Sequence, residues 1–70
     1  MTEAVNIDAM NEYELKALCE KHPNTTVVGQ YARTKLQAMA KRLAGQIEDA
    51  LRLETHMDRL YDLLPTSERW

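Results

Sequence analysis

Few side chains in this sequence have the types and spacing that acid–base or metal chemistry requires. His22 and His56 lie far apart, and neither has a cysteine or carboxylate at ligand spacing together with a matching set elsewhere in the chain. Glu54 is the one carboxylate that falls among apolar residues on its helix, but no second acid or histidine converges on it. We therefore expect no catalytic residue, no metal, no cofactor and no small-molecule ligand, and we interpret the chain as a non-enzyme.

The length and cysteine content limit how this chain can be stabilised. With 70 residues it is one small domain, below the size at which a single apolar core is comfortably sufficient. Its one cysteine, Cys19, cannot form an internal disulfide, which favours a reduced, cytoplasmic setting. The sequence has neither a signal-peptide pattern nor an apolar run long enough to span a membrane. The remaining ways to stabilise so small a chain are regular helix packing and oligomerisation, so we expect a homodimer. Residues 1–10 and 66–70 are expected to be flexible tails.

Capping signals predict a short first helix over residues 11–21. Asn11 is a favoured N-cap residue, and Glu14 three positions later completes the pattern of a capping box. Pro23 disfavours the helical conformation at the residue before it, so the helix is expected to stop there.

The segment Lys41–Leu51 predicts a turn between two longer helices. Two cations precede Gly45 and two carboxylates follow it, which suits a helix C-terminus followed by a helix N-terminus. Helices over about 24–44 and 46–64 would then form an antiparallel hairpin of nearly equal arms. The alternative is a single helix over 25–64, because the apolar spacing stays in helical phase through the glycine and one glycine costs only ~1 kcal/mol.

The second helix combines an apolar seam with the only basic segment of the chain. At 100° per residue the seam contains Val28, Ala32, Leu36, Met39 and Leu43. Residues 23–47 carry four bases and no acid, hence +4, whereas the segments on either side each carry −3. These bases, which are the candidate nucleic-acid-binding residues, are Arg33, Lys35, Lys41 and Arg42. Their division between two faces of the helix argues against a surface that reads bases in a groove.

The third helix has more apolar surface than one neighbouring helix can cover. Its apolar residues fill an arc of nearly 180°, whereas packing on one neighbour uses roughly 100°. We therefore expect a partner-binding surface formed by Leu53, Met57, Leu60, Tyr61, Leu64 and Trp70. Two points stay open. Glu54 either pairs with Lys35 or faces the partner, and Trp70 either folds back on the helices or anchors the partner.

Two short segments resemble known helical proteins. Gly45–Leu51 resembles the turn and second-helix start of a tetratricopeptide unit, which supports the hairpin. Met57–Ser67 is similar to the C-terminal stretch of the small haemolysin-modulating, nucleoid-associated proteins of enterobacteria, which are all-helical and act by binding a nucleoid-structuring protein. The general plan also resembles phage early proteins that inhibit host regulators, including quorum-sensing anti-activators.

Together these observations predict an all-α protein, an antiparallel helical hairpin with a short N-terminal helix in a homodimeric bundle. The leading hypothesis for its function is a non-enzymatic regulator that binds and modulates or inhibits another protein, such as a host transcriptional regulator. The alternative is a nucleoid- or DNA-associated modulator that uses the four bases of the second helix.

Overall fold

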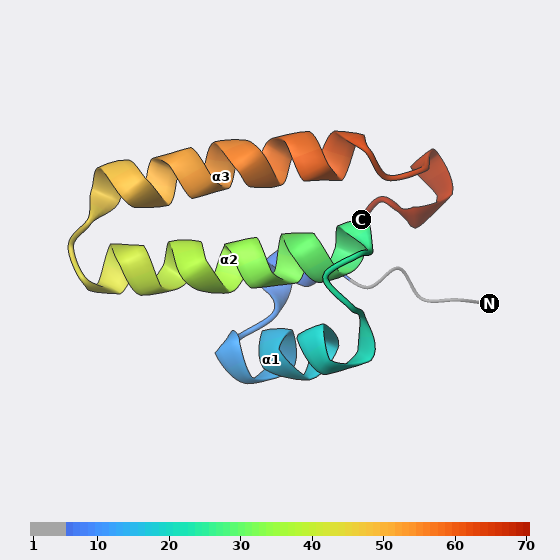
Figure 1. The fold of residues 1–70 in the computed structure, drawn as a ribbon, viewed down its shortest axis with the longest axis horizontal. Helices are drawn as coiled ribbons and strands as arrows, with labels where there is room; N and C mark the ends of the chain where they lie inside the picture. The colour runs from blue at the N-terminus through green and yellow to red at the C-terminus, as the bar shows by residue number, and fades with distance from the viewer. Residues whose placement is uncertain (1–5) are drawn as a thin grey trace.

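The protein is built entirely from helices over the range that the structure, a computed structural model, describes, residues 6–70. Short 3-10 turns at Ile7–Ala9 (η1) and Thr66–Glu68 (η2) flank the three α-helices, which are α1 (Glu12–Lys21), α2 (Val27–Leu43) and α3 (Ile47–Asp62). Helices α2 and α3 run antiparallel as a hairpin, and α1 packs on the other side of α2 (Figure 1). This confirms the predicted all-α hairpin with a short N-terminal helix. Within the described residues, no helix is both long and apolar enough to cross a membrane.

Gly45 forms the turn of the hairpin, so the alternative of one continuous helix is wrong. Its φ of 79° lies in the left-handed region, which glycine adopts without steric cost. The amide of Gly45 donates to the carbonyl of Arg42 at 3.1 Å, and the amide of Gln46 donates to that of Lys41 at 2.8 Å. These two bonds define a Schellman motif, which satisfies carbonyls that the end of α2 would otherwise leave unpaired.

Helix α1 begins and ends where the capping signals predict. Asn11 accepts from the amide of Glu14 at 2.8 Å, and the Glu14 carboxylate accepts from the amide of Asn11 at 3.3 Å, so the capping box is complete. The helix ends at Lys21, and His22 is extended before Pro23. Leu15, the only fully buried large side chain among the described residues, attaches α1 to the core.

At the start of α2 the backbone of the preceding loop lies very close to Gly29, and the sequence patterns did not reveal this contact. Thr26 caps the helix: its Oγ1 accepts from the amide of Gly29 at 3.0 Å and donates to the carbonyl of Pro23 at 2.8 Å. A Cβ at Gly29 would collide with the carbonyl of Pro23 and come within 2.7 Å of that of His22. Only a glycine therefore allows the loop from α1 to lie this close to α2.

Helix α2 is the central helix and buries two faces, against α1 and against α3. The predicted seam accounts for one of them, since Ala32 is fully buried and Leu36 and Met39 are half-buried. A second buried row consists of Tyr31, Thr34 and Ala38. The prediction is wrong for the last seam residue, because Leu43 is 89% exposed. Helix α1 stops short of the hairpin end, so among the described helices only α3 lies against that part of α2 (Figure 1).

The segments on either side of the helices pack on them, which corrects the expectation of flexible tails for the part that the structure describes. In η1, the side chain of Ile7 is buried in the core. At the other end, Trp70 also packs against the core. Both side chains are large and apolar, and their burial favours order over free movement. Residues 1–5 of the expected N-terminal tail lie outside the described residues.

Candidate protein-binding surface

The apolar residues predicted to contact a partner belong to the protein's own core, which corrects that assignment. Met57, Leu60 and Leu64 are buried. The remaining predicted contacts, Leu53, Tyr61 and Trp70, are half-buried and pack against the core cluster. The arc of α3 is wider than α2 alone covers, as expected. Trp70 packs on Tyr61 near the end of α3, whereas Ile47 and Leu51 near its start stay exposed.

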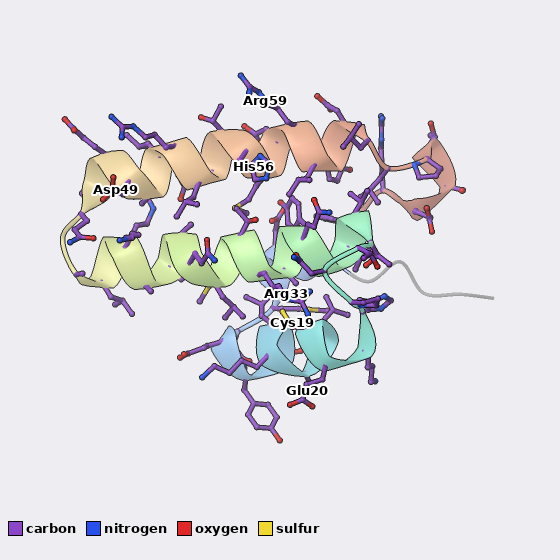
Figure 2. All side chains as sticks on the ribbon, in the orientation of Figure 1. Cys19, Glu20, Arg33, Asp49, His56 and Arg59 are labelled. Carbon is purple, nitrogen blue, oxygen red and sulfur yellow. The ribbon has the colours of Figure 1, made fainter. Side chains whose placement is uncertain are left out.

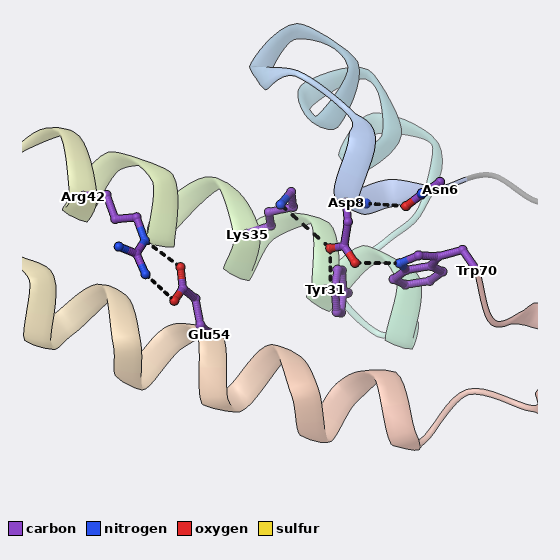
Figure 3. Close-up of polar contacts among 7 residues, drawn as sticks. All are labelled: Asn6, Asp8, Tyr31, Lys35, Arg42, Glu54 and Trp70. Carbon is purple, nitrogen blue, oxygen red and sulfur yellow. Dashed lines mark hydrogen bonds and ion pairs between the residues drawn. The ribbon is translucent and has the colours of Figure 1, made fainter.

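Trp70 covers part of the apolar arc of α3. Of the two alternatives for this residue, the structure shows the one in which it folds back on the helices. Its indole ring meets the rings of Tyr31 and Tyr61 edge to face, with each pair of centroids 4.8 Å apart. The indole Nε1 donates to Oδ2 of Asp8 at 3.0 Å (Figure 3). The hydroxyl of Tyr61 donates to the carbonyl of Trp70. The tail is therefore attached to η1, α2 and α3 together.

Asp8 is the polar centre of this attachment. Its Oδ1 accepts from the hydroxyl of Tyr31 at 2.7 Å and lies 3.8 Å from Nζ of Lys35 (Figure 3). Burial raises the pKa of Tyr31 well above its usual value of about 10, and the bond to the Asp8 carboxylate adds to the rise. The hydroxyl thus stays protonated as a donor near neutral pH, so this cluster is suited to holding the ends of the chain together and not to base or nucleophile chemistry.

Glu54 pairs with Arg42 and not, as one alternative held, with Lys35. Nε and Nη2 of Arg42 donate to the two carboxylate oxygens at 2.7 Å and 2.6 Å, a bidentate pair that joins α2 to α3 (Figure 3). The hydrogen bond from Arg42 lowers the pKa of Glu54 below its usual value, and the charge of Lys35 adds a smaller effect. Glu54 therefore has a structural partner within the chain.

The four bases of α2 are not gathered on one surface. Arg33 donates to the carbonyls of Cys19 and His22, both at 3.1 Å, and so attaches the end of α1 to α2 (Figure 2). Lys41 donates to Oε1 of Gln46 at 3.0 Å. Lys35 and Arg42 have the separate partners described above. Each of the four bases has its own contact within the chain, so nothing in their arrangement favours nucleic-acid binding.

Three of the large apolar side chains that are exposed among residues 6–70 lie at the end of the hairpin. Leu43 is 89% exposed, Leu51 is 52% exposed and Ile47 is 45% exposed, all within nine positions around Gly45. We call Leu43, Ile47 and Leu51 the hairpin-end patch. Leu63 and Tyr13 are also exposed, but they lie on other parts of the molecule. The sequence contained a signal for this patch. A turn at Gly45 places the adjoining helical turns at the end of the hairpin, where apolar residues have no further helix to pack on.

Two grooves on the described part of the chain are open to solvent and not enclosed. One open groove between α2 and α3 is lined by Gln37, Lys41, Asp49, Arg52 and Leu53. Another open groove lies on α1 and is lined by Met10, Tyr13, Glu14, Ala17, Leu18 and Lys21. Among residues 6–70, no group of three or more histidine, cysteine or carboxylate side chains is placed to hold a metal ion. These grooves lack the enclosure and convergent polar groups typical of a small-molecule site.

Comparison with known proteins returns no relative: no family model matches the chain, and no curated protein or solved structure is significantly similar to it.

Proposed function

We propose that this protein is a small, non-catalytic regulatory protein that binds another protein through the hairpin-end patch. The observation that carries the proposal is the exposure of Leu43, Ile47 and Leu51 together at one end of the molecule. Scattered single apolar residues are normal on a protein surface, whereas grouped large aliphatic side chains are typical of contact surfaces.

The shape and surroundings of the patch favour a partner with an apolar recess. The end of a hairpin is convex, so tight contact requires a concave surface on the other protein. Charged residues in the adjoining helical turns, such as Lys41 in the last turn of α2 and Glu48 in the first turn of α3, would supply the polar rim that surrounds most interface centres. Fully burying one large aliphatic side chain contributes about 1.5–3 kcal/mol, so the three together would supply the apolar centre of the contact.

The Arg42–Glu54 pair supports the same proposal because it holds the two arms together next to the patch. A bidentate pair fixes the spacing of α2 and α3 more tightly than a single hydrogen bond would. Side chains that are already in their bound arrangement lose less conformational freedom when a partner arrives.

For the class of partner we propose a transcriptional regulator. This part of the proposal rests on the resemblance of Met57–Ser67 to the haemolysin-modulating proteins and of the general plan to phage anti-activators. In both groups a small helical protein acts on a larger regulator and performs no chemistry of its own.

Affinity purification from the native host, followed by mass spectrometry, tests the proposal with a matched pair of variants. Leu51→Lys places a charge in the patch. Leu63→Lys places the same charge at the other end of α3, at a leucine that is still more exposed, at 68%. We expect the wild type and Leu63→Lys to retain the same protein, and Leu51→Lys to lose it by ~10-fold or more. Equal retention by all three proteins would show that the patch is not the binding surface.

A further inference from the structure

Residues 65–70 are attached to the rest of the fold mainly through one side chain. Residues 65–69 are all exposed and lie between the buried Leu64 and the half-buried Trp70, and η2 contributes no buried residue. Arg69 donates to the carbonyls of Leu64 and Asp62, both at 3.1 Å, so its bonds reach only the end of α3. Within the described chain, the attachment of this segment to η1 and α2 therefore depends on Trp70.

The contacts of Trp70 lie at the surface, where water can replace them. The side chain of Asp8, which accepts the indole N–H, is 53% exposed. If the indole leaves, the Asp8 carboxylate still accepts from the hydroxyl of Tyr31 and still lies near Nζ of Lys35. Detachment of the segment therefore leaves no buried polar group without a partner, and the cost of such a group does not oppose it.

The core of the three helices is complete without this segment. Leu15, Ala32, Met57 and Leu60 are buried and come from α1, α2 and α3, and Leu64 is the last buried residue before the segment. Segments with few buried apolar contacts open separately from the core, and at a lower cost in free energy than complete unfolding.

We propose that residues 65–70 form a reversible latch on the three-helix core. In the closed state, which the structure shows, Trp70 covers the rings of Tyr31 and Tyr61. In the open state the latch is detached, the three helices stay folded, and both rings are exposed to solvent. One end of the molecule thus alternates between a closed surface and an open aromatic surface.

Asp8 holds the latch closed. Its Oδ2 accepts from the indole N–H of Trp70 at 3.0 Å, and this hydrogen bond ties the latch to η1 (Figure 3). A carboxylate is a stronger acceptor than a neutral oxygen, so closure depends on the charge at position 8. The latch lies at the end of the hairpin opposite Gly45, away from the hairpin-end patch (Figure 1). It can therefore succeed or fail independently of the proposed function.

Hydrogen exchange followed by NMR tests the latch in the wild type, because Trp70 is the only tryptophan and gives one indole N–H signal. The backbone amide of Leu60, a residue that is 3% exposed, is the reference for unfolding of the core. We expect the indole N–H to be protected, but with a protection factor at least ~10-fold lower than that of Leu60 and nearly independent of urea at low concentration. Equal protection with the same dependence on urea would overturn the proposal, because the latch would then open only when the core unfolds. An unprotected indole N–H would also overturn it, because the latch would then not be closed.

A matched pair of variants tests the role of Asp8. Asp8→Asn keeps an oxygen for the hydroxyl of Tyr31 but presents an N–H₂ donor where the indole needs an acceptor. We expect the protection factor of the indole N–H to fall by ~10-fold and that of the Leu60 amide to stay unchanged. Glu68→Gln, which removes a carboxylate charge at an exposed position of the latch itself, should change neither. An equal fall at both groups in Asp8→Asn, or no fall at the indole, would overturn the proposal that Asp8 holds the latch closed.

Discussion

The indole Nε1 of Trp70 donates a 3.0 Å hydrogen bond to the carboxylate of Asp8, 62 positions earlier in the chain. The two residues belong to neither arm of the hairpin, yet together they close it at the end opposite Gly45. Trp70 covers Tyr31 of α2 and Tyr61 of α3, and Asp8 binds the hydroxyl of Tyr31. This long-range contact covers apolar surface that α2 alone would leave exposed on α3.

Removing the indole of Trp70 should therefore destabilise the fold strongly. Trp70→Ala loses two edge-to-face ring contacts and the hydrogen bond to Asp8, and we expect it to lower the free energy of unfolding by about 3 kcal/mol. Trp70→Phe keeps an aromatic ring but no donor and should cost about 1–2 kcal/mol. Urea titration followed by circular dichroism measures both. A Trp70→Ala value within ~0.5 kcal/mol of wild type would show that the contact contributes nothing.

The two glycines should differ in their response to alanine. Gly45→Ala strains a residue at positive φ but meets no atom within 4 Å, so it should cost about 1–2 kcal/mol. Gly29→Ala places a Cβ against two backbone carbonyls of the loop before α2, which cannot move aside without shifting α1. We expect Gly29→Ala to lower the free energy of unfolding by about 3 kcal/mol, because the collision outweighs the higher helix propensity of alanine. Thermal unfolding measures the stability of the two variants. A larger loss for Gly45→Ala than for Gly29→Ala would contradict the close contact between Gly29 and the loop before α2.

The Arg42–Glu54 pair should make stability depend on pH on the acid side. Because Arg42 lowers the pKa of Glu54 in the folded protein, the pair contributes its full stabilisation above the unfolded pKa of about 4.3 and loses it as the pH falls through the lower folded pKa. The difference in free energy of unfolding between wild type and Glu54→Gln should be present near pH ~6 and narrow toward pH ~3. A difference that stays constant over this range would show that the ionised pair does not stabilise the fold.

Tyr31 should produce a dependence on pH at the alkaline end. Its pKa is raised in the folded state, mainly by burial, so its contribution is complete below the unfolded value of about 10 and falls as the pH rises through the folded value. Tyr31→Phe should lower the free energy of unfolding by about 1 kcal/mol near pH ~8. Above pH ~10 the wild type should lose stability relative to the variant, which has no hydroxyl at this position to ionise. An equal loss of stability in wild type and Tyr31→Phe would show that a group other than Tyr31 causes the alkaline transition.

Local signals in the sequence were sufficient to predict the helices and the turn. The capping box of Asn11 and Glu14, the stop before Pro23 and the glycine at position 45 each act through neighbours within a few residues. Their outcome does not depend on the rest of the fold, and each was confirmed at the predicted place.

Contacts between distant residues could not be predicted in the same way. Helical phase identified the wide apolar arc of α3, but it did not show that Trp70 covers part of it. It likewise placed Lys35 near Glu54, whereas Arg42, about two helical turns nearer to the hairpin end, makes the bidentate bond. The assignment of Leu53, Met57 and their neighbours to a partner failed for this reason, since exposure is a property of the whole fold.

We propose the hairpin end, and not the inner face of α3, as the surface that contacts another protein. Site-specific photocrosslinking in the native host tests it most directly, with a photoreactive side chain at position 51 and, as the matched control, at position 63. We predict a discrete covalent product with one other protein from position 51 and none from position 63. Equal products from both positions, or none from position 51 while the folded protein is present, would contradict it.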